Sequence, residues 1–136
     1  IDADMIGMGP YITSSGADMV DEGMMPVPSL MQLSLNMIAV TRLIMRNVNI
    51  AAATALETLV PNGRIKGILH GCNVVMPNIT PQQTRSDYQL YNNKAGCEVG
   101  AESNILVEEN IVHLAHRTLG LNKLGSSLRW QMRTAA

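Results

Sequence analysis

The positions of apolar, small and polar residues along the chain predict strands that alternate with helices. An apolar run over 5–12, interrupted by Gly and Pro, is typical of a buried strand that leads into a loop. Apolar residues recur every three or four positions over 30–45, with Ser29 before them as a candidate cap, and this spacing predicts a helix packed on one face. Runs of small and apolar residues predict two more strands, over 49–55 and 73–76.

Three further amphipathic segments predict helices between and after these strands. The first follows Gly63 and ends near Gly71, which lies where a helix terminus favours a left-handed residue. Its inward positions are predicted to be Ile65, Ile68 and Leu69. Thr80 and Pro81 pair an N-cap with a proline in the first helical position, and they predict a helix over 80–91. A last amphipathic helix is predicted to begin at 103 or 104 and to end at Gly120.

This element order predicts an α/β fold with parallel strands and right-handed crossovers. Strands of such continuous apolar character are expected to be covered on both faces. Three strands do not close a barrel, because an eight-stranded one takes about 250 residues. We therefore expect the C-terminal part of a (βα)8 TIM-type barrel, about strands six to eight plus the closing helices. Residues 1–98 are predicted to form the half-barrel and residues 99–136 a C-terminal helical tail.

The low content of charged residues predicts that something other than water covers much of the surface. Of the 136 residues, 46% are hydrophobic and only 15% are charged, against about 25% charged residues in an average soluble domain. There is no Phe and one Trp against ten Met, which predicts a soft, aliphatic core. No apolar run reaches the roughly 20 residues that span a bilayer, and no signal peptide is recognised. No membrane association and a cytoplasmic location, or an organelle in a eukaryote, are the expectations.

Charge and cysteine content exclude several other classes. The net charge is −1 and the basic residues are scattered singly, so no nucleic-acid partner is expected. Cys72 and Cys97 form neither a CxxC pair nor a disulfide framework, and we expect Cys72 to be a buried structural thiol in a reducing compartment. His113 and His116 share a helix face without further ligands, which favours ordinary surface residues over a metal pair.

Candidate binding residues gather at the predicted C-terminal ends of the strands, where parallel barrels build their sites. Gly7 and Gly9 lack the third glycine of a dinucleotide-binding loop, and they are expected to let a ligand or a neighbouring backbone approach the strand end. Small residues over 51–55 leave room for a ligand. Hydrogen-bonding groups around that space would come from Thr54, Asn78, Tyr88 and Tyr91. No nucleophile or acid–base pair can be assembled from these residues, so they predict the wall of a ligand pocket and no reaction.

The segments 4–12, 37–42 and 49–55 resemble the C-terminal half of the HydE family, the radical S-adenosylmethionine maturases of FeFe hydrogenase. The resemblance is clearest over 71–81, which reads GCNVVMPNITP, and in the Tyr-Gln-Leu-Tyr that ends at Tyr91. Biotin synthase and methylornithine synthase are similar at a greater distance.

The resemblance implies a (βα)8 barrel with a 4Fe-4S cluster and S-adenosylmethionine, whose cleavage gives a 5′-deoxyadenosyl radical that acts on a small-molecule substrate. Hydrogenase maturation proteins are the implied partners. The family binds its cluster through a CxxxCxxC loop, which this chain lacks. The chain is therefore expected to be a C-terminal fragment of a full-length enzyme, without metal ligands or catalytic residues of its own and inactive by itself.

The resemblance also implies roles for individual residues, matched position by position. Met5 matches a residue on the cofactor side, Thr54 and Ala55 match an anion-binding stretch, and the residues that match the inner cavity are Met76, Tyr88 and Tyr91. The chain has Ala53 where the family often has Thr, which removes one hydroxyl from the anion-binding stretch. Cys97 matches an accessory-cluster cysteine, but no CxxC follows it. Both tyrosines are equally compatible with packing roles.

Two alternatives remain open from the sequence. The chain also fits a fragment of a biotin synthase-like or methylornithine synthase-like enzyme. A non-catalytic half-barrel that self-associates is the alternative from another class, because a second copy would cover an open strand edge.

Overall fold

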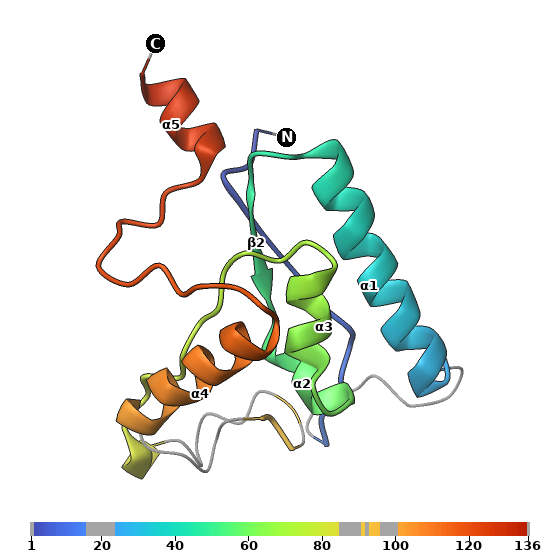
Figure 1. The fold of residues 1–136 in the computed structure, drawn as a ribbon. Coiled ribbons are helices and arrows are strands. Elements are labelled where there is room, and N and C mark those ends of the chain that lie inside the picture. Colours follow the sequence, from blue (N-terminus) through green and yellow to red (C-terminus); the bar gives the residue numbers. More distant parts are fainter. Residues whose placement is uncertain (1, 16–23, 85–90, 92, 96–100, 136) are drawn as a thin grey trace.

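A computed structural model describes residues 2–15, 24–84, 91, 93–95 and 101–135 (Figure 1). Two parallel strands, β1 (Met5–Met8) and β2 (Asn49–Ala52), pair in register from Met5 with Asn49 to Met8 with Ala52. The helix between them, α1 (Val27–Ile44), makes this a β–α–β crossover. The mixed α/β class is confirmed, although the sheet described contains only these two strands.

The remaining elements are short helices. Two of them follow β2 directly and form a tight corner, α2 (Thr54–Leu59) and α3 (Gly63–Leu69). The 3-10 helix η1 (Gln82–Thr84) lies within the segment predicted to be helical over 80–91, most of which falls outside the described residues. The C-terminal part contains α4 (Ala101–Leu114) and α5 (Leu128–Thr134).

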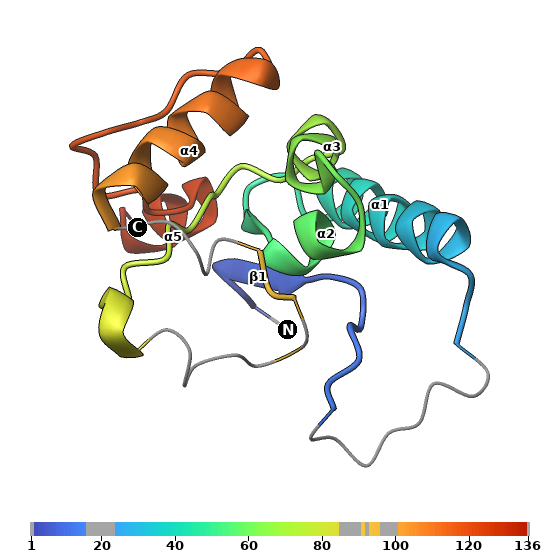
Figure 2. The same cartoon turned by 90° about the horizontal axis from the view of Figure 1, so that it is seen from below.

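The core lies between the strands and the helices packed on them. Figure 2 shows α1, α2 and α3 gathered beside the strands, with α4 farther along. Ile38 of α1, Ile50 of β2 and Leu56 of α2 are fully buried, and Val112 of α4 joins the same cluster. Along β1 only alternate residues face this cluster, and Met5 is 47% exposed. The expectation that this strand is covered on both faces is therefore wrong for the chain by itself.

The predicted third strand is reduced to one parallel bridge between Val74 and Ala51. The side chain of Asn73 explains the interruption, because its Oδ1 accepts the N–H of Ile50 in place of a backbone carbonyl. Pro77 follows and has no N–H to donate to a longer ladder.

Element boundaries shift for local reasons. Helix α1 begins at Val27, with Pro26 before it and a proline in its first turn, so Ser29 lies inside the helix and does not cap it. Strand β2 ends at Ala52 because the next residues turn into α2. Helix α4 ends at Leu114, since the backbone reverses at His116 with a φ of 55°. Leu69, predicted to face inward, is exposed.

Helix α1 is, within the described ranges, the one helix long and apolar enough to cross a membrane by length and composition. Core helices of soluble proteins meet the same test, so one such helix is weak support for a membrane location. One face of α1 is buried in the protein, at Met31, Ser34, Leu35 and Ile38. The opposite face leaves large apolar side chains exposed: Leu33, Met37, Val40, Leu43 and Ile44.

Candidate functional site

The C-terminal edge of the parallel strands is built from small residues that pack closely. A Cβ placed on Gly9 would lie 3.1 Å from the Cβ of Ala53 and 3.6 Å from that of Ala55. The chain leaving β1 therefore runs directly against the start of α2. Gly9 thus allows a close approach of a neighbouring segment at this edge, whereas a Cβ on Gly7 would meet nothing within 4 Å.

Thr54 and Tyr91 meet at this edge although they are far apart in the sequence. The Oγ1 of Thr54 lies 3.0 Å from the phenol oxygen of Tyr91, and either hydroxyl can be the donor. A second bond holds the same segment, because the N–H of Ala95 donates to the Oγ1 of Thr58 at 3.0 Å. Residues 91 and 93–95 are thereby fixed over α2, which brings a tyrosine to the end of β2.

Of the other predicted site residues, Ala55 lies next to Thr54 at this edge and Met5 does not. Met76 is 49% exposed and lies in the segment after the Val74 bridge. Met5 begins β1 and pairs with Asn49, at the opposite end of β2 from Thr54. The two ends of β2 are about 10 Å apart, at the usual rise of about 3.3 Å per strand residue. Tyr88 lies outside the described residues, so the roles given to these side chains stay predictions.

The residues present do not fit a 4Fe-4S cluster. Such a cluster takes several thiolates, and the chain has two cysteines. Cys72 is 4% exposed and its thiol donates to the carbonyl of Ala51 at 3.4 Å, so the expected buried thiol is confirmed. Burial raises the pKa of this thiol to about 11, which keeps it protonated at neutral pH. Cys97 lies outside the described residues.

Histidines do not change this conclusion. His113 and His116 are both exposed, as expected for surface residues. Across the described part of the chain, no three His, Cys, Asp or Glu side chains come close enough together to hold a metal ion.

The N-terminal edge of the sheet is organised by Arg42, near the end of α1. Its guanidinium donates to the carbonyls of Gly71 at 2.9 Å and Val48 at 2.8 Å. It also donates to the Oδ1 of Asn73 at 2.9 Å. The sequence places a cation in the last turn of this helix, but its partners lie up to 31 positions away and no local pattern reveals them.

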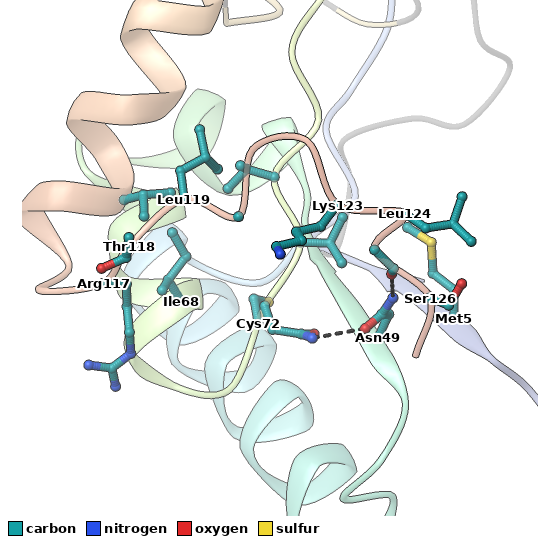
Figure 3. Close-up of a pocket in the computed structure, with 16 residues that line it drawn as sticks. Met5, Asn49, Ile68, Cys72, Arg117, Thr118, Leu119, Lys123, Leu124 and Ser126 are labelled. Carbon is teal, nitrogen blue, oxygen red and sulfur yellow. Dashed lines mark hydrogen bonds between the residues drawn. The ribbon is translucent and has the colours of Figure 1, made fainter. Parts of the chain in front are cut away.

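A cavity of about 650 Å³ lies at this same edge, between the strand starts and the segment 117–126 (Figure 3). Met5, Asn49 and Cys72 line it from the sheet side, and Lys123 lines it from the C-terminal segment. Sequence reasoning missed this cavity, because a loop that folds back across a sheet edge leaves no periodic signal.

One comparison with known proteins gives a clear similarity. The chain is 41% identical over 93 residues to the FeFe hydrogenase maturase subunit HydE of Thermotoga maritima. The similar stretch takes in 68% of this chain but only 26% of the relative, so the chain spans about a quarter of the length of the curated protein it matches. No family model matches the chain. The 93 residues are thus HydE-like in sequence.

Proposed function

We propose that this chain supplies part of the cavity wall of a radical S-adenosylmethionine enzyme of the HydE type, acting in assembly of the FeFe hydrogenase active site. The observation that carries the proposal is the 41% identity to HydE over 93 residues. The β1–α1–β2 crossover supports it, since the same parallel unit repeats around a (βα)8 barrel. On this proposal the enzyme is cytoplasmic and works with other hydrogenase maturation proteins.

The contribution proposed for this chain is binding and not cluster chemistry. Its residues do not fit a 4Fe-4S cluster, so the proposal takes the cluster ligands from outside these 136 residues. S-adenosylmethionine, when bound in such an enzyme, supplies the 5′-deoxyadenosyl radical. A contact between Met5 and this cofactor is part of the proposal, and it would lie at the other end of the sheet from Thr54.

Thr54 and Tyr91 are proposed to present one hydrogen-bond donor to the small-molecule substrate. Their mutual bond uses the hydrogen of one hydroxyl, and the other O–H stays available. That remaining hydrogen suits a carbonyl or anionic oxygen of a ligand. Ala53 and Ala55 beside the pair pack against Gly9, and Met76 and Tyr88 are proposed to complete the same wall.

The proposal is tested by a chimera in which the matching stretch of Thermotoga maritima HydE is replaced by this chain's 93 residues. After anaerobic cluster reconstitution, the chimera is expected to cleave S-adenosylmethionine to 5′-deoxyadenosine and to support hydrogenase activation. A folded chimera that holds its cluster but makes no 5′-deoxyadenosine would contradict the proposal.

The hydroxyl pair is tested within the active chimera by two single changes, Tyr91→Phe and Thr54→Val. Each removes one hydroxyl, so substrate turnover is expected to fall about tenfold, the cost of roughly one good hydrogen bond to a ligand. Thr84→Val is the matched control, because it removes an exposed hydroxyl that donates only to the carbonyl of Pro81. Equal turnover in all three variants would remove the pair from the proposed wall.

A second candidate function, a self-associating half-barrel, is favoured by one observation. The outer edge of β1 faces no strand in the described part of the chain, and α1 exposes large apolar residues. Sedimentation equilibrium of the 136-residue chain distinguishes the two: a tight homodimer favours self-association, and a monomer that enters the active chimera favours the first proposal.

A further inference from the structure

The cavity at the N-terminal edge of the sheet has the size of a ligand site and lies away from the Thr54–Tyr91 pair. Its volume of about 650 Å³ falls within the roughly 300–1,000 Å³ typical of small-molecule pockets. The sheet contributes Met5 and Asn49, and the C-terminal segment contributes Lys123 and Leu124, as Figure 3 shows. Met5 is the one lining residue that also has a part in the proposed function, whereas Lys123, Arg117 and the apolar residues of the lining have none.

The lining combines an apolar floor with positive charge. Side chains from α3, the Val74 segment and α4 form the floor: Ile68, Val74, Val75 and Val112. Arg117 and Lys123 are the charged residues of the lining, which contains no Asp or Glu. In Figure 3 the side chain of Lys123 extends over the cavity, with Arg117 on one side and Met5 on the other.

The side chains of Asn49, Asn73 and Cys72 in the lining are already engaged in hydrogen bonds. Asn49 donates through its Nδ2 to the carbonyl of Gly125 at 2.8 Å, and its Oδ1 accepts from Asn73 at 2.9 Å. The thiol of Cys72 donates to a backbone carbonyl. The ammonium of Lys123, in contrast, has no hydrogen bond or ion pair with any residue that the structure describes.

We infer that this cavity binds a small amphipathic anion, such as a medium-chain carboxylate. The apolar floor would take the hydrocarbon body, because burying it removes apolar surface from water. The carboxylate would pair with the ammonium of Lys123, and Arg117 would add a second cation at the rim. The inference does not depend on the proposed function, since none of these groups lies at the C-terminal edge of the strands.

The test measures binding of octanoate and of 1-octanol to the full 136-residue chain by isothermal titration calorimetry. The two probes share one hydrocarbon chain length and differ in charge. Octanoate is expected to bind at one site, about tenfold more tightly than the alcohol at low salt, and to weaken as salt screens the charges. Amide shifts of Gly120 and Gly125 in an NMR titration locate the site, because both residues line the cavity.

Two charge reversals complete the test. Lys123→Glu is expected to weaken octanoate binding at least about fivefold, because it replaces an attractive charge by a repulsive one. Lys66→Glu makes the same change in net charge on the exposed side of α3, outside the lining, and is expected to leave affinity within about twofold. Equal binding of the two probes, equal effects of the two variants, or no saturable octanoate binding would each overturn the inference.

Discussion

At the scale of single residues, Arg42 holds together three parts of the chain. Its guanidinium reaches carbonyls after α1 and after α3, and it fixes the side chain of Asn73. Asn73 in turn replaces a backbone acceptor for Ile50. The planar guanidinium can serve several acceptors at once, so this one residue satisfies polar groups that would otherwise be left without partners near the core.

We expect Arg42→Lys to lower the free energy of unfolding by about 2 kcal/mol, because an ammonium cannot reproduce the guanidinium's spread of donors. Urea unfolding followed by circular dichroism measures the change. Arg46→Lys is the matched control, since Arg46 is exposed and the neighbouring bonds use only its backbone carbonyl. Lysine keeps the positive charge in both variants. If Arg42→Lys loses no more stability than Arg46→Lys, the charge of Arg42 alone accounts for its effect.

A second prediction at this scale concerns the reactivity of the Cys72 thiol. With a pKa of about 11, only about one thiol in a thousand is ionised at pH 8, and the side chain is also buried. In a Cys97→Ser variant, alkylation of Cys72 by iodoacetamide is therefore expected to be slow in the native state and fast in urea. Mass spectrometry follows the reaction, and rapid native alkylation would show that the cavity exposes the thiol.

At the scale of elements, a buried ion pair joins α4 to α3. Arg64 donates through Nη1 and Nη2 to both carboxylate oxygens of Glu108, at 2.7 and 2.5 Å, and each side chain is at most 6% exposed. Val112 and Ala115 of α4 pack into the same core cluster. The docking of α4 thus combines apolar burial with one charged contact that cannot be shared with water.

Removing one partner of this ion pair is expected to lower the free energy of unfolding substantially. Glu108→Gln would leave the guanidinium of Arg64 buried without a counter-charge, and the free energy of unfolding should fall by about 3 kcal/mol. Glu109→Gln, at the next and less buried position, is expected to change it by less than about 0.5 kcal/mol. Urea unfolding of the two variants gives the comparison, and equal stabilities would contradict a structural role for the pair.

Elements with local signals were predictable from the sequence. The helix over 30–45 follows from periodicity, and the strand beginning at 49 follows from a run of small and apolar residues. Gly71 adopts the expected positive φ, at 130°. The third strand was not predictable as a single bridge, because its interruption comes from the Asn73 side chain. Of the candidate site, the strand-end position of Thr54 was predictable. Its bond to Tyr91 depends on a loop that returns from 37 positions away.

At the scale of the whole molecule, charges at the two ends of the chain hold α5 against the start of β1. Asp2 pairs with Arg129 and Arg133, and Asp4 pairs with Arg133. A backbone bond from Arg129 to the carbonyl of Asn47 adds to this contact. The acidic beginning and the basic end of the sequence are therefore complementary in space.

The pH dependence of this contact follows from the pKa of Asp2. Hydrogen bonds from Arg129 and Arg133 lower it below its usual 3.8, so the contact's stabilisation is present above that pH and is lost as pH falls through the lowered value. Trp130, the one tryptophan, lies on α5 and reports its docking. We expect its emission to stay constant between pH 8 and about pH 5, and to shift toward the red below about pH 4.

Asp2→Asn provides the control for this experiment. The variant is expected to show at pH 7 part of the red shift that the natural chain shows only in acid, and high salt should reproduce the effect because the pairs are exposed. Emission that is identical in the two proteins at every pH would show that these pairs do not hold α5.

The parallel pairing of β1 with β2 also bears on how quickly the chain can fold. Each residue of β1 meets a partner about 44 positions later, so the loop must close before any strand bond forms. Folding slows as the sequence separation of native contacts grows. Until that closure, Ile6 and Met8 of β1 lack their neighbour β2, and the exposed apolar face of α1 adds to the surface open to other chains. Until this crossover closes, the apolar surface of β1 and α1 is therefore open to aggregation and to capture by chaperones.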